Sequence, residues 1–127
     1  MKAIDGDSLP RSTADEKTFV LPAFVQKLLG RDDQLPIRIY RVSFGEGSRM
    51  NWHRHDDIQI LYGLSGKCVV VNRQGAEVTL KAGDLVVIDP EEEHWHGAAP
   101  GTEGEHLAIN LGSNTTWLDA DPVQLHG

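Results

Sequence analysis

Hydrophobic and polar residues along this 127-residue chain form short alternating or apolar runs separated by regularly spaced turn signals. The clearest run, residues 37–44, is rich in β-branched and aromatic side chains and ends at Gly45, which predicts a strand. Helical periodicity is absent over residues 59–111. Short strands at this spacing are typical of a β-sandwich or barrel, so the sequence predicts an all-β fold. Further strands are expected at residues 18–21, 59–64, 67–72, 76–80, 85–88, 92–98 and 105–111.

The N-terminal part of the pattern is less regular. Residues 1–16 are polar and show no periodicity, so we expect an irregular N-terminal arm before a single domain at residues 17–127. Residues 23–30 fit either a helical turn ended by a glycine or an edge strand, and the sequence leaves both alternatives open. A chain of this length forms one domain with a substantial core, and no internal repeat or second domain is visible.

Composition and charge narrow the expected partners and compartment. A hydrophobic content of 39% and a charged content of 24% are ordinary values for a folded domain. The net charge of −7 disfavours nucleic acids and anionic membranes, since both select basic surfaces. A single cysteine, Cys68, excludes an internal disulfide framework, and no apolar run resembles a signal peptide or a membrane span. We therefore expect a cytoplasmic protein without nucleic-acid or membrane partners.

Histidines at strand spacing mark the candidate chemistry. His53 and His55 are separated by one residue, so in an extended strand both imidazoles point to the same side and form a chelating pair. Gln59 follows shortly after, and His94 begins a second pair with the same spacing far downstream. Three neutral imidazoles and an amide oxygen form an incomplete coordination shell that suits a divalent first-row metal such as Mn, Fe, Ni, Cu or Zn.

The spacing of these residues resembles the first of the two cupin motifs. That motif consists of a glycine, five residues, H-x-H, three or four residues, an acid, six residues and a second glycine. The chain meets it throughout, but has glutamine where the family usually has glutamate. The matching residues are Gly47, His53, His55, Gln59 and Gly66.

The second cupin motif is matched less completely. Gly83 and His94 occupy its first glycine and its ligand histidine. Asp89 and Glu91 stand where the family has proline and glycine, and Ala98 stands where an asparagine often closes the motif. The resemblance implies a single-domain cupin, a double-stranded β-helix or jelly-roll barrel, whose metal site is built from residues 47–66 and 83–98.

A closer resemblance involves the segments 94–100 and 106–109. They are similar to small bacterial cupins related to carboxymuconolactone decarboxylase-type proteins, a group that includes the manganese-dependent cupin hydroxynitrile lyases. Those lyases also have glutamine in the acid position of the first motif. The resemblance implies Mn(II) as the metal, with Fe(II), Ni(II) or Zn(II) as alternatives. The implied ligands are His53, His55, Gln59 and His94.

The same resemblance assigns the residues around the metal. His96 and His106 would line the pocket beside it, with His106 as the leading proton-transfer group. Candidates for the rest of the pocket wall are Tyr40, Val42 and Asn110.

Residues adjacent to the histidines have other expected roles. Asp56 and Asp57 could bind a metal through their carboxylates, but the cupin register favours the glutamine. Trp52 and Trp95 directly precede or follow ligand histidines, so on a strand they should point the opposite way, into packing contacts.

Three functions fit these features. The first is a metal-dependent lyase of hydroxynitrile or retro-aldol type, acting on a small molecule with the metal as a Lewis acid and His106 as acid and base. The second is a metal-dependent cupin dioxygenase, and the third is a non-catalytic module that binds a small ligand. A homodimer is expected from the resemblance, with the apolar side chains around Phe19 and Phe24 suited to strand exchange.

Overall fold

The computed structural model describes residues 1–15, 17–21, 23–30 and 35–118. Apart from the 3-10 helix η1 (Gly6–Ser8), the regular structure in these ranges is β. No helix among the described residues is long and apolar enough to cross a membrane. The strands are β1 (Ser12–Thr13), β2 (Phe19–Val20), β3 (Ala23–Leu29), β4 (Arg38–Phe44), β5 (Arg49–Met50), β6 (His53–His55), β7 (Gln59–Asn72), β8 (Glu77–Lys81), β9 (Leu85–Ile88), β10 (His94–Ala98), β11 (Gly104–Asn110) and β12 (Thr115–Trp117).

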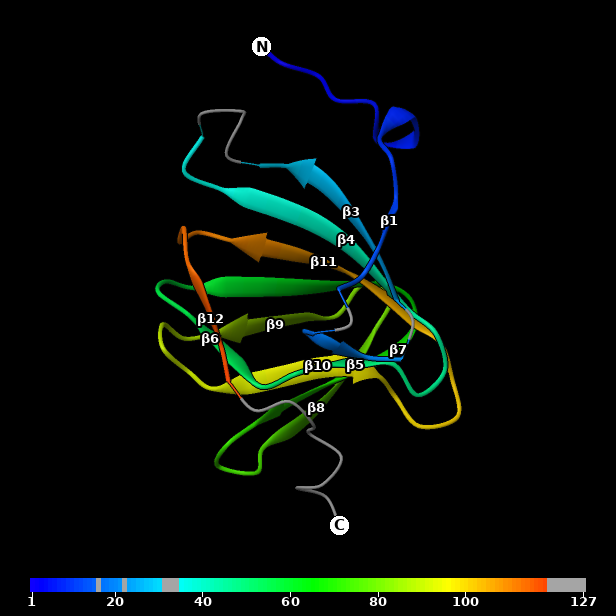
Figure 1. Cartoon of the computed structure of the whole chain (residues 1–127), viewed down its shortest axis with the longest axis vertical. Coiled ribbons are helices and arrows are strands. Elements are labelled where there is room, and N and C mark those ends of the chain that lie inside the picture. The colour runs from blue at the N-terminus through cyan, green and yellow to red at the C-terminus, as the bar shows by residue number, and fades with distance from the viewer. Residues whose placement is uncertain (16, 22, 31–34, 119–127) are drawn as a thin grey trace.

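The strands form one antiparallel sheet that curls around a common interior (Figure 1). Its main path runs β1-β3-β4-β11-β7-β10-β5-β2. β8 and β9 each pair with β7, and β6 pairs with β10 and β12. The prediction of an all-β barrel is confirmed, and residues 23–30, left open by the sequence, contain a strand that pairs with β4.

The long strand β7 departs from the sequence prediction. Two strands with a turn at residues 65–66 were expected, and this prediction is wrong because β7 runs through the turn signal. Gly66 has a φ of 59°, and the pairing with β11 shifts register between Glu105 and His106, as at a β-bulge. The first half of β7 pairs with β9 and β11, and the second half pairs with β8 and β10. The bulge therefore lets one strand serve both sides of the barrel.

Alternation along β7 separates two hydrophobic clusters. Val70 faces the main core, which includes Phe44 and Leu61. Its neighbours Val69 and Val71 belong to a second, smaller cluster with Trp52 and Trp95. The prediction that these tryptophans point away from the histidines into packing contacts is confirmed.

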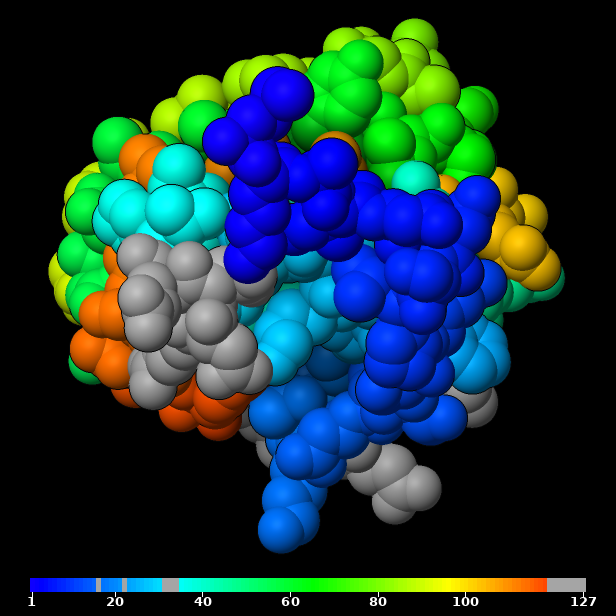
Figure 2. Space-filling view, turned by 90° about the horizontal axis from the view of Figure 1, so that it is seen from above, coloured from blue at the N-terminus to red at the C-terminus, as the bar shows by residue number. Residues whose placement is uncertain are grey.

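The N-terminal residues lie on the outside of this barrel. β1 pairs with β3, and the buried Gln26 side chain on β3 donates hydrogen bonds from Nε2 to the carbonyls of Gly6 (2.7 Å) and Leu9 (3.0 Å). Figure 2 shows these residues running over the surface of the neighbouring strands. The barrel interior is filled by residues from β2 onwards, since Phe19 and Ala23 belong to the main core.

Candidate functional site

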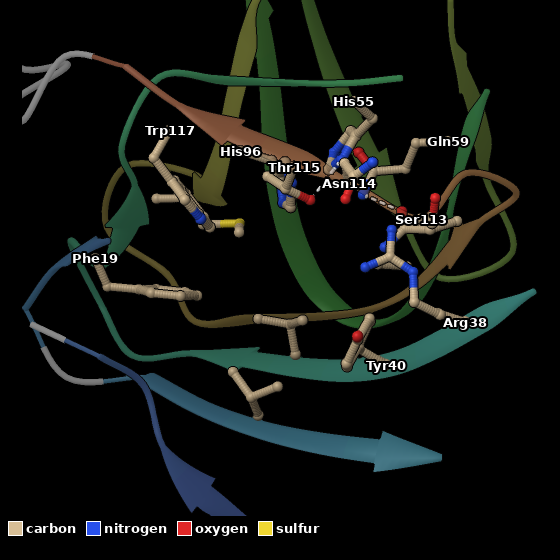
Figure 3. Close-up of a pocket in the computed structure, with 15 residues that line it drawn as sticks. Phe19, Arg38, Tyr40, His55, Gln59, His96, Ser113, Asn114, Thr115 and Trp117 are labelled. Carbon is tan, nitrogen blue, oxygen red and sulfur yellow. Dashed lines mark hydrogen bonds between the residues drawn. The ribbon is translucent and has the colours of Figure 1, made fainter. Parts of the chain in front are cut away.

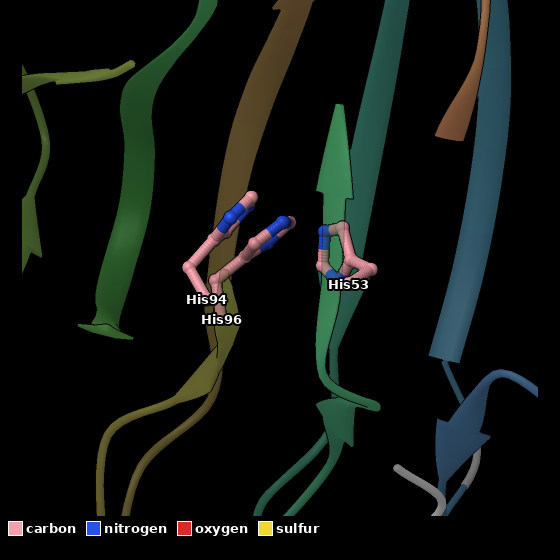
Figure 4. Close-up of side chains that lie close together, drawn as sticks. All are labelled: His53, His94 and His96. Atoms are coloured by element: carbon pink, nitrogen blue, oxygen red, sulfur yellow. The ribbon is translucent and has the colours of Figure 1, made fainter. Parts of the chain in front are cut away.

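Neighbouring strands bring the predicted histidines to one point inside the barrel. β6 pairs with β10 so that His53 lies opposite His94. Because side chains alternate, His55 and His96 face the same side as their partners two residues earlier. Figure 4 shows the rings of His94 and His96 directed towards His53 on the facing strand. Gln59, at the start of β7, is also buried.

The Nδ1 atom of each predicted ligand histidine is held by a neighbour. Bonds of this kind fix the tautomer and the ring orientation and leave Nε2 available. The three contacts are His53 Nδ1 with the Asn51 carbonyl (2.7 Å), His94 Nδ1 with the Glu92 carbonyl (2.8 Å) and His55 Nδ1 with Thr115 Oγ1 (3.0 Å).

The inward-facing atoms are mostly acceptors without donors. A carbonyl only accepts hydrogen bonds, so Nδ1 of His53 and His94 carries the proton and Nε2 presents a lone pair. Nε2 of His53 and of His55 is buried without a partner in the described part of the chain. The Gln59 side chain donates a hydrogen bond from its amide Nε2 to Asn110 Oδ1 (2.8 Å). Its Oε1, which is an acceptor, therefore faces Nε2 of His94 at 3.1 Å. Lone pairs converging in this way fit a shared cation.

Burial keeps these imidazoles in the neutral form that coordinates a metal. Desolvation, and then the neighbouring histidines, hold the pKa of His53 well below its ordinary value. Desolvation lowers the pKa of His55 to about 4, and it also lowers the pKa of His94. All three rings are therefore neutral near physiological pH, and a metal needs to displace no proton from them.

Two overlapping sets of candidate metal ligands are present. Ring nitrogens of His53, His94 and His96 lie within 4.8 Å of one another, and all three residues are buried. The ring centroid of His55 lies 5.0 Å from that of His53 and 5.3 Å from that of His94, so it borders the same space. Three buried histidines can thus hold a metal ion, and imidazole with amide oxygen suits a divalent first-row metal.

His96 and His106 form a buried pair beside this cluster. His96 Nδ1 and His106 Nε2 are 2.8 Å apart, so one ring nitrogen donates to the other. The Phe44 ring packs against both, with centroid distances of 6.1 Å and 5.4 Å. Burial lowers the pKa of both rings, that of His106 to about 4. Only His96 of the two lines the adjoining pocket.

The adjoining pocket has a volume of about 410 Å³ (Figure 3). His55, Gln59 and His96 form its histidine-rich side. The predicted wall residues Tyr40, Val42 and Asn110 line it. The remaining lining residues are Phe19, Val25, Arg38, Met50, Ala108, Ser113, Asn114, Thr115 and Trp117.

Some of these lining residues were missed from the sequence. Arg38 could have been found, because it shares the inward phase of Tyr40 and Val42 on β4. Thr115 and Trp117 had no such signal, because β12 is a three-residue strand that only its pairing with β6 defines.

Asp56, the alternative oxygen ligand, has a different role. Its side chain is exposed, and its carboxylate accepts hydrogen bonds from the backbone N–H groups of Ser113 (3.1 Å) and Asn114 (3.3 Å). These bonds lower the pKa of Asp56, that from Asn114 most. The residue thus holds the loop before β12, which forms part of the pocket wall.

Residues 40–111 match the profile described as Cupin domain, so the chain belongs to the cupin family and its barrel is a cupin barrel. Over 82 residues it is 40% identical to an (R)-mandelonitrile lyase from Granulicella tundricola, a match covering 61% of this chain and 62% of the lyase. The match thus spans about three fifths of the lyase.

Solved structures agree on the fold. A cupin-like protein from Thermotoga maritima is 34% identical, with a TM-score of 0.82 and 90% of each chain covered. The polyketide cyclase RemF from Streptomyces resistomycificus is 19% identical, with a TM-score of 0.74 and coverage of 86% of this chain and 78% of the cyclase. The likeness to the cyclase concerns the fold alone.

Proposed function

We propose that the protein is a metal-dependent lyase of hydroxynitrile or retro-aldol type that acts on small α-hydroxy nitriles or carbonyl compounds. The observation that carries the proposal is the convergence of lone pairs from neutral histidines and Gln59 beside a pocket that His96 lines. The similarity to a mandelonitrile lyase supports the same reaction class.

The proposed ligands are His53, His55, Gln59 and His94, and the expected metal is Mn(II). A divalent metal held by these neutral groups supplies a Lewis acid that retains both positive charges and polarises a substrate oxygen. The chain's own contribution is to hold the rings in one tautomer through Asn51, Glu92 and Thr115.

The His96–His106 pair supplies the proton transfer. Nε2 of His96 has no partner among the described residues and lies at the pocket, so we assign it to the substrate hydroxyl. His106 acts through Nδ1 of His96, which it contacts at 2.8 Å, and sets the protonation state of that ring. For a cyanohydrin, His96 takes the hydroxyl proton while the C–CN bond breaks, which yields an aldehyde and cyanide. Addition of cyanide to the aldehyde reverses the step.

An anaerobic assay tests the reaction. The manganese-loaded protein with mandelonitrile should release benzaldehyde without oxygen. His106→Gln and His96→Gln should retain the metal and lower kcat by about 10²- to 10⁴-fold, the usual contribution of a positioned acid–base group. Tyr62→Phe, on the outer face of β7, is the control and should leave the rate unchanged. Absence of any cyanohydrin turnover by protein with stoichiometric manganese would refute the proposal.

Metal content separates the two ligand sets. His55→Ala and His96→Ala are compared after dialysis against dilute chelator, with the bound metal measured by mass spectrometry. The proposed set predicts metal loss in the His55 variant and retention in the His96 variant. The reverse result would assign the metal to His53, His94 and His96 instead.

A metal-dependent dioxygenase is the second candidate. It is favoured by the histidine-rich ligand set, because three imidazoles with open positions also suit oxygen activation. Oxygen uptake with a phenolic or diketone substrate, in place of anaerobic lyase turnover, would select it. Saturable binding without turnover of either kind would indicate a ligand-binding module.

The homodimer and the cytoplasmic location stay predictions. Phe19 is buried in the chain's own core, which leaves Phe24 as the exposed aromatic of the N-terminal strands. A second apolar surface lies on the outer side of the sheet, where Tyr62 is paired with Leu85 and Val87 stays exposed. Light scattering of the wild type, Phe24→Lys and Val87→Lys would show whether a dimer forms and which surface it uses.

A further inference from the structure

The pocket wall carries a cation that the proposed chemistry does not use. Arg38 begins β4, and its guanidinium projects towards Ser113 in the pocket (Figure 3). Its Nε donates a hydrogen bond to the Gly112 carbonyl at 3.0 Å, which anchors one edge of the group. Its Nη2 is buried and has no hydrogen-bond partner among the described residues. An unmatched donor of this kind favours a ligand that brings an acceptor.

The charge of Arg38 is also unbalanced within the pocket. The lining residues in the described part of the chain include no aspartate or glutamate. The salt bridges found among the described residues use Arg54 and Arg73, not Arg38. The nearby Asp56 carboxylate is engaged by backbone N–H groups of the loop before β12. The pKa of His55 is lowered mainly by burial, and the positive charge of Arg38 lowers it further.

These features favour an anionic ligand, although the net charge of the chain is −7. A guanidinium presents a planar set of donors that matches the two oxygens of a carboxylate. The volume of about 410 Å³ lies near the small end of ligand pockets and suits a small acid. Apolar lining residues such as Val42 and Trp117 can contact the aromatic or aliphatic part of a ligand whose carboxylate lies at Arg38.

We propose that Arg38 binds a carboxylate of the substrate, so that the pocket takes small molecules with an acid group remote from the reacting carbon. The identity of the reaction rests on the proposed lyase function, whereas recognition of the acid does not. Under that function the substrate class is the cyanohydrin, or comparable adduct, of an aldehyde that carries a carboxylate. Arg38 is then the residue that separates such substrates from uncharged ones.

Binding to the metal-free protein tests the recognition without the reaction. Calorimetric titration with benzoate and with benzyl alcohol compares an anion with an uncharged molecule of similar size, and removing the metal prevents direct coordination of the carboxylate. The wild type should prefer benzoate. Arg38→Gln should weaken benzoate binding by about 10- to 100-fold, as expected for loss of a charged hydrogen bond. Arg38→Lys should give an intermediate affinity, because it keeps the charge but lacks the planar donors.

A matched control lies on the same strand. Arg41 pairs with Leu107, one residue out of phase with the pocket-lining positions of β4, so Arg41→Gln makes the same charge change away from the pocket. Arg41→Gln should leave benzoate affinity within about 2-fold of the wild type, because substitutions away from a site usually have only small effects. Circular dichroism and thermal unfolding of each variant verify that the fold is intact.

The manganese-loaded protein supplies the second measurement. The cyanohydrins of 4-carboxybenzaldehyde and benzaldehyde are compared, and Arg38→Gln should lower the ratio of their kcat/KM values by about 10- to 100-fold, mainly through KM. Equal binding of benzoate and benzyl alcohol, or unchanged benzoate binding by Arg38→Gln, would overturn the inference. Arg38-dependent benzoate binding without cyanohydrin turnover would instead refute the lyase and leave the inference standing.

Discussion

Acidification should strongly destabilise the metal-free protein, because its interior histidines cannot readily accept protons. The pKa of His55 and of His106 is about 4 in the folded protein, whereas an unperturbed histidine has a pKa of about 6.5. The unfolded chain therefore takes up protons below about pH 7, and the folded chain takes them up only near pH 4. Since the folded pKa is the lower one, this contribution to stability is present above the unfolded pKa and is lost as the pH falls towards the folded pKa.

The magnitude follows from those two pKa values. Between about pH 7.5 and pH 5, each of these histidines should lower the free energy of unfolding by about 2 kcal/mol, and the two together by about 4 kcal/mol. Burial also lowers the pKa of His53, His94 and His96, which adds to the loss. A domain has a total stability of only about 5–15 kcal/mol, so much of it should disappear over this range.

Urea unfolding followed by circular dichroism provides the assay, with EDTA-treated protein at several pH values from about 7.5 to 5. Between these pH values the free energy of unfolding of His106→Gln should fall by about 2 kcal/mol less than that of the wild type, whatever the stability of the variant at neutral pH. A saturating divalent metal should stabilise the neutral form at high pH, and this gain should fall on acidification as protons compete for the imidazoles. If the free energy of unfolding of the metal-free wild type fell by less than about 1 kcal/mol over this pH range, the assignment of buried neutral histidines would be refuted.

Three further results are expected. Gln59→Glu should slow metal loss to EDTA, because a carboxylate attracts the ion more strongly than an amide; faster loss would place the metal elsewhere. Cys68, whose pKa burial raises to about 12, should resist labelling by a disulfide reagent near pH 8 until urea unfolds the chain; rapid labelling of the native protein would contradict its burial. Gly97→Ala would place a Cβ 2.6 Å from the Cβ of Arg49 on β5. This overpacking should lower the free energy of unfolding by about 1–3 kcal/mol, as measured by urea titration. An unchanged urea midpoint would show that β5 can move aside.

Local sequence signals predicted most of the strands, and their failures have identifiable causes. The β-branched and aromatic composition of residues 37–44 and the apolar run 85–88 are local signals, and each segment contains a strand in the structure. The turn signal at residues 65–66 was misread, because the strand continues through it: Gly66 is paired with Gly104, and a register shift leaves Leu64 as the extra residue of a bulge. Residues 23–30 had no preference of their own, and pairing with β4 makes them a strand.

The arrangement of the histidine pair shows the same limit. The sequence predicted that both His96 and His106 line the pocket, whereas in the structure only His96 of the two lines it and His106 contacts the His96 ring. Both lie on inward-facing strand positions, so alternation alone could not rank them. β11 itself borders the pocket through Ala108 and Asn110, so the position of His106 farther back along that strand is set by how the strands pair in three dimensions.

By itself, the sequence determined the all-β class, the faces on which the histidines lie and their chemical kind, because strand alternation and side-chain chemistry are local properties. Only the tertiary structure decided that His53 lies opposite His94, that Gln59 turns its oxygen towards His94, and that Arg38 enters the adjoining pocket with an Nη2 that has no hydrogen-bond partner among the described residues. Those relations join residues distant in the chain. They depend on strand register and on the closure of the barrel, which no short stretch of residues specifies.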